Sequence, residues 1–401
     1  MHFIGIDLAD KKHDICILDP SGKVLNEFIV SHSPEGLDQL LDTIRSIPED
    51  QPILIAAETP RYLFIQYLHA LGYTVFGINP KSVDRARDRF SPAGAKDDKR
   101  DTRVLADLLR TDRHQYRPIR VDNDFLIELK HLVHDRETLV SNLKSVENQI
   151  RSCLKDYYPR ALECFSKLDQ KVTIAFLRRY PTPTAFNNAS YHELAQIFKE
   201  GHHPKWRTKA EELAKLAKRQ QFHVDQATIR TKSRFLMTLL KQLELLLEDL
   251  LQYKKDIDTL VKLHPDSGLF LNLRGVGANL AARLLVHFGD DRDYYSHANA
   301  VQCEAGTAPV TRRSGKKKTV RFRRACQKSF RNTMQNFAIQ MVRFHEWSKK
   351  LFLEHRRRGR SKSECYRIVA NKWLKILFAM WKKRVPYDPD IYLKAKQQQA
   401  A

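Results

Sequence analysis

The chain has 401 residues, with 70 lysine and arginine against 47 aspartate and glutamate residues, a formal net charge of +23. This length suggests two or three domains. No apolar run is long enough to span a bilayer, and the first residues lack the basic-then-apolar order of a signal peptide, which argues against membrane and secreted proteins. Six scattered cysteines without a Cys-x-x-Cys pair suit a reducing compartment, so we expect a cytoplasmic location.

The excess positive charge is concentrated at one end of the chain. Residues 1–100 carry 12 basic and 15 acidic side chains, residues 101–300 carry 32 and 26, and residues 301–401 carry 26 and 6. The last quarter alone therefore has a net charge of +20. This asymmetry points to a polyanion partner, with nucleic acid favoured over an acidic membrane surface. A merely solvated basic face is the weaker alternative.

Strand and helix patterns alternate along the first 112 residues. The first three segments are short, apolar and β-branched, which predicts an antiparallel meander. In the fourth segment, Ser33 is a plausible N-cap before Pro34 at the first helical position. The segments are, in order, FIGIDLA, HDICILD, KVLNEFIV, SPEGLDQLLDTIRSI, ILIAAE, PRYLFIQYLHALG, YTVFGIN and residues 98–112. The order βββαβαβα predicts an α/β layer with a mixed sheet.

From about residue 122 to 263 the pattern becomes helical. Two leucine-rich stripes repeat at a spacing of three to four residues, which permits an antiparallel coiled coil within a chain or between chains. An ordinary helical-bundle core would give the same periodicity. The stripes are Leu129, Leu132, Leu139, Leu143, Val146 and Ile150, and then Leu236, Leu239 or Leu240, Leu243, Leu246 or Leu247 and Leu250.

The last region begins with LNLRGVGANLAARLLVHFGD, which resembles a helix-hairpin-helix whose Gly-Val-Gly turn presents backbone N–H groups to a phosphate. A plain turn between helices would also use these glycines. A loop or β-ribbon dense in cations follows at residues 312–324. The candidate nucleic-acid contacts are Gly275, Gly277, Arg312, Arg313, Lys316, Lys317, Lys318, Arg321, Arg323 and Arg324. We expect domains at 1–120, 121–265 and 266–401.

Four carboxylates are candidates for one site. Asp7 lies on the first strand and Glu58 ends the strand ILIAAE, so the two emerge on one edge if these strands are adjacent. Asp98 and Asp101 lie one helical turn apart at the start of a helix that can cross the same edge. Like charges at close range are costly without a cation, and Mg²⁺ prefers hard oxygen ligands. A pair of such ions about 4 Å apart can clamp a phosphodiester.

Each of these acids also has an ordinary explanation. Asp7 could belong to a turn, Glu58 could cap a helix, and Asp98 and Asp101 could face a helix dipole. Singly we would favour those explanations; together, on this scaffold in a nucleic-acid binder, we favour the metal site. The weaker candidates are Asp10, Asp14 and Asp97.

Several motifs resemble one family. GIDLADKKHDICILD, AAETP, KDDKRD, LRGVGANLAARLLVHFGD, GTAPVTRRSGKKK and ANKWLKILFAMWKKRVPY are similar to the DEDD transposases of the IS-one-ten (IS110) insertion-sequence group and the related Piv invertase. The resemblance covers both ends of the chain. It implies an RNase H-like amino domain similar to the RuvC resolvase, then a helical coiled-coil region and a helical basic carboxyl domain.

The resemblance also implies a mechanism. The family's four acids map onto Asp7, Glu58, Asp98 and Asp101, which would hold Mg²⁺ or Mn²⁺, and its essential serine maps onto Ser314. Because serines in basic loops are common, the resemblance and not the spacing singles out Ser314. The implied partners are donor and target DNA, a non-coding bridge RNA, and further copies of the chain, as a dimer that becomes a tetramer in the synapse.

The sequence departs from the family pattern at the basic loop, where Ala325-Cys326 replaces a usual Gly-Asn, and at Asp97 and Thr102. None of these positions is a mapped acid or the serine. Three alternatives stay open: a RuvC-like metal nuclease that uses water, a non-enzymatic nucleic-acid binder, and an actin-fold sugar kinase. The kinase would need a Gly-Thr-Thr-type phosphate turn, but the sequence after the first strand is Ala9-Asp10-Lys11-Lys12.

Overall fold

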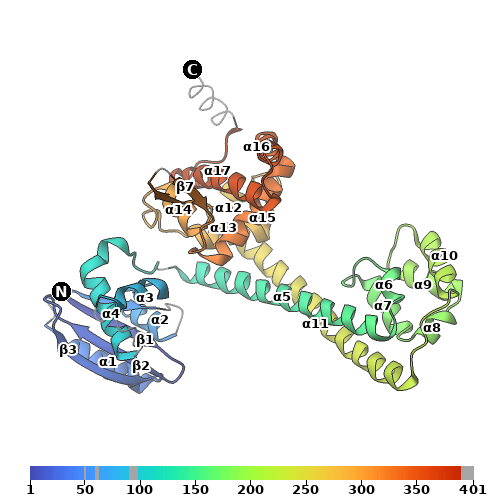
Figure 1. Ribbon diagram of the computed structural model, residues 1–401, viewed down its shortest axis with the longest axis horizontal. Coiled ribbons are helices and arrows are strands. Elements are labelled where there is room, and N and C mark those ends of the chain that lie inside the picture. Colours follow the sequence, from blue (N-terminus) through green and yellow to red (C-terminus); the bar gives the residue numbers. More distant parts are fainter. Residues whose placement is uncertain (49–50, 59–62, 90–97, 121, 316, 390–401) are drawn as a thin grey trace. The chain divides into compact units, whose positions relative to one another are not determined.

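The computed structural model describes the chain except for residues 49–50, 59–62, 90–97, 121, 316 and 390–401. It divides into two compact units, an amino unit, Met1–Val121, and a carboxyl unit, Asp122–Ala401 (Figure 1). Among the helices that are described, none combines the length and apolar character needed to cross a membrane.

The amino unit is built on a five-stranded mixed sheet with the order β3-β2-β1-β4-β5. The first three strands pair antiparallel, which confirms the predicted meander, whereas β1 pairs parallel with β4 and β4 with β5. The strands are β1 (His2–Leu8), β2 (Lys12–Leu18), β3 (Val24–Ser31), β4 (Ile53–Ala57) and β5 (Thr74–Gly77). Strand β1, which carries Asp7, and strand β4, which Glu58 follows directly, are therefore neighbours.

Helices cover both faces of this sheet. Alternating side chains of the strands supply an apolar surface to each face, with Ile4 and Ile6 on one side and Phe3 on the other. The first face packs against α1 and α2, and the second against α3 and α4. The helices are α1 (Pro34–Arg45), α2 (Leu63–Ala70), α3 (Pro80–Arg87) and α4 (Asp98–Asp112), followed by the short turn η1 (Arg113–Gln115). Helix α3 was not predicted.

Local signals explain where two of these helices begin. The Ser33 hydroxyl accepts a hydrogen bond from the Gly36 N–H, as predicted for the start of α1. Asn79 does the same for α3, since its side chain accepts from the Lys81 N–H directly before Pro80. The Asn-Pro pair is thus the signal that would have revealed α3.

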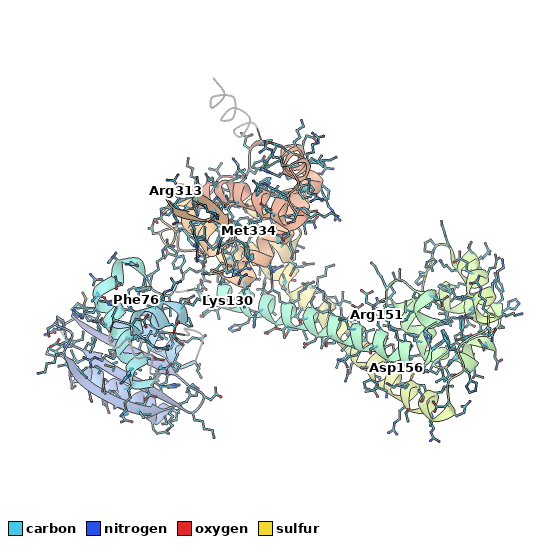
Figure 2. All side chains as sticks on the ribbon, in the orientation of Figure 1. Phe76, Lys130, Arg151, Asp156, Arg313 and Met334 are labelled. Carbon is cyan, nitrogen blue, oxygen red and sulfur yellow. The ribbon has the colours of Figure 1, made fainter. Side chains whose placement is uncertain are left out.

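The carboxyl unit contains two long helices, α5 (Asp124–Tyr157) and α11 (Gln226–Leu263), which pack against each other. The start of α5 shares a core with the end of α11, and the end of α5 shares another with the first half of α11. The pairing is therefore antiparallel and within one chain. Figure 2 shows Lys130 near one end of α5 and Arg151 and Asp156 near the other.

Short helices complete both cores of the carboxyl unit. At one end of the long pair lie α6 (Ala161–Cys164), α7 (Lys171–Arg179), α8 (Pro183–Asn187), α9 (Tyr191–Glu200) and α10 (Trp206–Ala217). At the other lie α12 (Ser267–Leu271), α13 (Ala278–Phe288), α14 (Ala298–Glu304), α15 (Lys328–Phe344), α16 (Glu346–Arg357) and α17 (Lys362–Lys383). The predicted ribbon between α14 and α15 is a two-stranded hairpin, β6 (Val310–Ser314) and β7 (Lys317–Arg321). We call it the serine hairpin.

Candidate active site

The register of the sheet places Asp7 and Glu58 side by side at one edge. In the parallel pair β1 and β4, Ile6 lies opposite Ala57, so the next residues along the two strands are Asp7 and Glu58. Side chains alternate along a strand. Since Ile6 and Ala57 pack on the face covered by α1 and α2, both acids belong to the opposite face, which α4 covers. Both are half-buried.

Helix α4 crosses the sheet next to Asp7 because Gly5 has no side chain. A β-carbon at Gly5 would lie 1.9 Å from the Thr102 carbonyl oxygen and 2.9 Å from the Ala106 nitrogen. The glycine thus permits direct contact between strand and helix backbones. Thr102 is followed along α4 by the buried Leu105 and Leu109, and it is preceded by Asp101. The contact brings the first turn of α4 to the face that carries Asp7.

Asp101 is a buried carboxylate, 5% exposed, that is held by an arginine. Arg87, the last residue of α3, donates from Nε and Nη2 to the two Asp101 oxygens at 2.5 and 2.7 Å, and from Nη1 to Asp84 at 3.0 Å. The pKa of Arg87 is raised, chiefly by its hydrogen bonds to Asp101 against the effect of burial, and further by the charges of Asp101, Asp84 and Glu58. Arg87 therefore interacts electrostatically with both Asp101 and Glu58.

We call Asp7, Glu58 and Asp101 the carboxylate edge. The predicted partner Asp98 is the first residue of α4, but its side chain lies outside the described part of the structure. The predicted residues Asp97 and Lys316 also lie outside the described residues. Asp14 lies directly opposite Asp7 on β2, and Asp10 is exposed. Sequence reasoning missed Arg87 because it missed α3.

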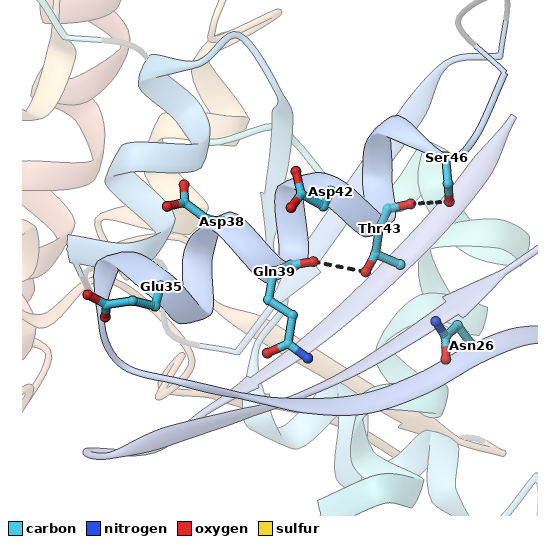
Figure 3. A pocket seen from close by; sticks show the side chains of 7 residues that line it. All are labelled: Asn26, Glu35, Asp38, Gln39, Asp42, Thr43 and Ser46. Atoms are coloured by element: carbon cyan, nitrogen blue, oxygen red, sulfur yellow. Dashed lines mark hydrogen bonds between the residues drawn. The ribbon is translucent and has the colours of Figure 1, made fainter.

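A groove on the amino unit is distinct from the carboxylate edge (Figure 3). It is lined by α1 and the edge strand β3, and its charged lining is acidic: Glu35, Asp38 and Asp42. It contains none of the predicted site residues. This acidic charge opposes the binding of a phosphate backbone.

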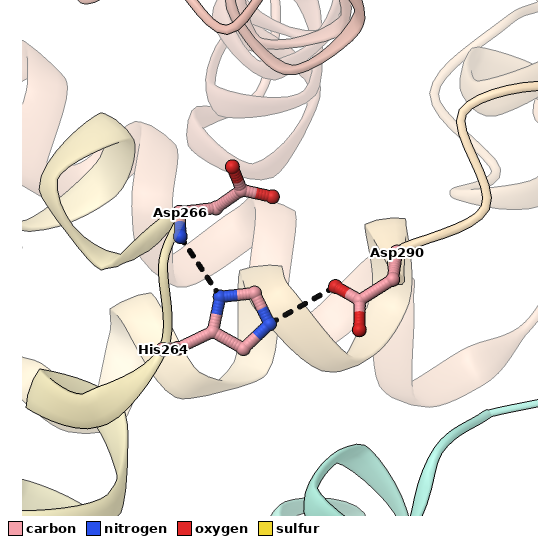
Figure 4. Close-up of side chains that lie close together, drawn as sticks. All are labelled: His264, Asp266 and Asp290. Carbon is pink, nitrogen blue, oxygen red and sulfur yellow. Dashed lines mark hydrogen bonds and ion pairs between the residues drawn. The ribbon is translucent and has the colours of Figure 1, made fainter.

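A second group of potential metal ligands lies in the carboxyl unit (Figure 4). The described residues contain one cluster of three with all ligand atoms within 4.8 Å, namely His264, Asp266 and Asp290. The His264 Nδ1 accepts from the Asp266 N–H at 3.1 Å, so its Nε2 donates to Asp290 at 3.0 Å. Arg292 pairs with Asp266, and the Asn123 amide donates to Asp290 at 2.8 Å. Protein groups therefore already satisfy the cluster, and it acts as an ion-pair network between helix ends.

Ser314 ends β6 at the tip of the serine hairpin. It pairs in register with Lys317, is exposed, and precedes Gly315, whose φ of +54° lies in the left-handed region. Most of the predicted basic contacts are exposed on the same hairpin, namely Arg312, Arg313, Lys317, Lys318 and Arg321, and Arg324 is exposed just after it. The serine therefore sits among cations in reach of solvent.

The foot of the hairpin is anchored by polar contacts. The Asn371 side-chain oxygen on α17 accepts from the Thr307 hydroxyl at 2.9 Å, and the Asn371 carbonyl accepts from the Gln302 amide at 2.6 Å. Arg323 is half-buried and donates to the Ala308 carbonyl at 3.2 Å. Arg323 thus closes the hairpin at its base, in addition to any contact with a ligand.

The predicted Gly-Val-Gly turn joins α12 to α13. Gly275 has a φ of +94°, and a β-carbon there would lie 2.3 Å from the Phe344 ring, so packing alone requires this glycine. Gly277 is the N-cap of α13, and a β-carbon at this position would meet no described atom within 4 Å. Of the two glycines, only Gly277 therefore leaves open space at the helix start.

Two family models match the chain: DEDD_Tnp_IS110, described as a transposase, over residues 4–159, and the IS116/IS110/IS902 transposase family over residues 267–353. The mini-circle putative transposase for IS117 of Streptomyces coelicolor is 33% identical over 325 residues, 79% of this chain and 78% of that protein. The chain belongs to the IS110 family of transposases. The putative transposase y4uE of Sinorhizobium fredii is 34% identical over 185 residues, 45% of this chain and 51% of that protein.

The transposase is an enzyme that cleaves and rejoins DNA, and its DEDD domain implies dependence on a divalent metal. The first matched region contains the whole carboxylate edge, and the second contains the serine hairpin. The two candidate catalytic elements therefore lie in different family modules. The sugar-kinase and non-enzymatic alternatives are excluded by this membership.

Proposed function

We propose that Asp7, Glu58, Asp98 and Asp101 form the metal-binding catalytic centre of the transposase, within an RNase H-like, RuvC-like amino domain. The observation that carries this proposal is the register of β1 and β4, which puts Asp7 and Glu58 on the face crossed by the start of α4. The strand order β3-β2-β1-β4-β5, with only the first three strands antiparallel, supports the fold assignment.

The donor set suits Mg²⁺ or Mn²⁺, because carboxylate oxygens are the ligands that these hard cations prefer. When bound, the cation would stabilise negative charge that develops on a phosphodiester. In the described arrangement Arg87 compensates Asp101 and lies near Glu58. These acids therefore already require a positive charge, which is the property expected of a cation site.

The Ser314 hydroxyl is the proposed nucleophile. Its Oγ attacks a DNA phosphorus, the Oγ–P bond forms, the bond from phosphorus to the leaving DNA oxygen breaks, and the hydroxyl proton ends on that released oxygen. The phosphoserine link conserves the phosphodiester, so a second strand can be joined without ATP. Arg312, Arg313 and Lys317 lie on the same hairpin and supply charge to hold the DNA.

We further propose that donor and target DNA are selected by a bridge RNA held by the basic carboxyl unit. The transposase would work as a dimer that becomes a tetramer when two DNA sites are joined. Its parts would be a catalytic domain at 1–120, a helical stalk at 121–265 and a nucleic-acid-binding domain at 266–401. The charge of +20 on the last 101 residues supports the binding of both nucleic acids.

The covalent step can be tested by trapping the transposase on a nicked DNA that carries the element end. We expect protein linked to DNA with the wild type and with Thr311→Ala, a control hydroxyl exposed on the same strand β6, and none with Ser314→Ala. Free ends without linked protein from the Ser314→Ala variant would favour a water-using nuclease. Mixing Asp98→Ala with Ser314→Ala chains should restore activity if the centre is shared between chains.

A further inference from the structure

An aromatic ring at the foot of the serine hairpin lies between two arginines. Phe322 directly follows β7 and is 39% exposed. The guanidinium carbon of Arg367, on α17, lies 4.5 Å from the ring centroid, and that of Arg331, on α15, lies 4.9 Å from it. Two successive elements and the later helix α17 thus bring two cations to one half-exposed ring. None of these three residues was a predicted contact.

Neither arginine has a carboxylate partner among the described residues. Arg331 donates to the Cys326 sulfur and to the Arg324 carbonyl, and Arg367 stacks on the ring. Other arginines of the same unit are paired: Arg358 bonds Glu354 at 2.6 Å and Arg360 bonds Glu364 at 2.7 Å.

The charges around Arg367 bear on whether its guanidinium can bind an anion. Its pKa is lowered, chiefly by burial; the charge of Glu364 opposes this, and the smaller effect of the Arg331 charge adds to it. Two partly buried like charges whose hydrogen-bond partners are neutral gain from an anion that joins them. The nearby carboxylate, Glu364, already bonds Arg360 at 2.7 Å, so the two guanidinium groups at the ring are the charges open to an incoming anion.

We propose that Arg331, Phe322 and Arg367 form a clamp for one phosphodiester of the nucleic-acid strand that passes along the serine hairpin. Guanidinium groups bind phosphate oxygens through paired hydrogen bonds, and stacking on an aromatic ring fixes their planes. This deepens the proposed action on DNA and rests on it, but it does not require Ser314 to be the nucleophile.

The clamp sits at a defined distance from the serine. The strand from Lys317 to Phe322 advances five residues, or about 17 Å at about 3.3 Å per residue. In a duplex aligned with the hairpin this corresponds to about five phosphates of one strand. The clamp would therefore set the register of the strand relative to the tip and not take part in bond breakage.

The test is the salt dependence of binding, measured by fluorescence anisotropy with three labelled probes: a duplex of the element end, one of its strands alone, and an RNA of the same sequence. Loss of one phosphate contact lowers the slope of log affinity against log salt by about 0.9 for a duplex and about 0.7 for a single strand. We expect that loss in Arg367→Gln and Arg331→Gln, and a retained slope in Arg367→Lys. Arg358→Gln, which removes an equal but paired charge, should keep the wild-type slope.

The probe that shows the loss identifies the strand in the clamp. Thermal unfolding without nucleic acid serves as the second measurement, and Arg367→Gln should be at least as stable as the wild type. If Arg367→Gln and Arg358→Gln have equal slopes with all three probes, or if Arg367→Gln lowers only the melting temperature, the clamp is wrong and the stack is structural. If the wild type binds none of the probes, the proposed function itself fails.

Discussion

The carboxylate edge and the serine hairpin are built in opposite ways. The edge is fixed from within, since strand register, a buried helix and a two-pronged arginine hold Asp7, Glu58 and Asp101. The hairpin has only two strands, and its tip is exposed on both sides. An isolated two-stranded ribbon is marginally stable on its own. The edge is thus held by packing and ion pairing within the fold, whereas Ser314 at the tip of the hairpin pairs with Lys317 and is exposed.

The largest expected difference between the two regions comes from adding a side chain at Gly5 of the edge and at Gly315 of the hairpin. Gly5→Val should cost about 3 kcal/mol or more of unfolding free energy and abolish activity, because its β-carbon would meet the α4 backbone at 1.9 Å. Gly315→Ala should cost only about 1 kcal/mol, the strain of a left-handed residue in open space. Urea unfolding measures both. Equal losses would show that the edge tolerates movement of α4.

A second prediction concerns the cation that the edge already contains. Arg87→Gln leaves the buried Asp101 without its partner, so the metal-free protein should lose about 3 kcal/mol of stability. The same change removes a competitor for the acids. Manganese affinity, measured by calorimetry, should therefore rise about tenfold, the equivalent of about 1.4 kcal/mol.

The matched control is Arg89→Gln, an exposed arginine that pairs with Asp112 at 3.3 Å. It should change neither manganese affinity nor stability by a measurable amount. Weaker manganese binding by Arg87→Gln would mean that Arg87 supports the site instead of competing for it. Unchanged binding in Asp101→Asn would place the metal elsewhere.

The same contrast explains how much could be predicted from the sequence. The positions of Asp7 and Glu58 at the ends of FIGID and ILIAAE predicted a shared edge on the condition that the two strands are neighbours, and the structure supplies that pairing. The meander and the start of α1 were predicted correctly because strand patterns and helix caps are local signals. Arg87 was missed, since its role depends on a short helix and on contacts between segments far apart. The Phe322 stack has no periodic signal at all.

A third prediction uses pH to separate the two regions. His13 is fully buried, its Nε2 lies 2.8 Å from the His32 Nδ1, and burial followed by the His32 charge lowers its pKa to about 4. An unfolded histidine near its ordinary value of about 6.5 binds more protons, so stability falls as pH drops from about 6.5 towards 4. From pH 7 to 5 this contribution is about 2 kcal/mol.

Urea unfolding at both pH values measures it, and His13→Gln should remove that part of the pH dependence, whatever its effect at pH 7. Contacts between basic side chains and phosphates are screened by salt, so nucleic-acid binding by the folded protein should respond to salt far more than to pH. An unchanged pH dependence in His13→Gln would assign the titration to other groups.

The last prediction tests the proposal that the edge of one chain acts with the hairpin of another. Leu243 is fully buried in the core between α5 and α11, so it stabilises the chain's own fold, whereas Leu245 and Leu251 on the same helix are 61% and 54% exposed. The proposed contact with a second copy along α11 would bury these exposed leucines. Leu245→Glu and Leu251→Glu should change stability by no more than about 0.5 kcal/mol yet lower the mass seen by light scattering. They should also abolish rescue in mixtures of Asp98→Ala and Ser314→Ala chains. Gln242→Glu adds the same charge at an exposed polar position of α11 and should do neither. If the leucine variants keep the wild-type mass and rescue, the subunits meet through another surface, and the stalk serves only to hold the two ends of the carboxyl unit apart.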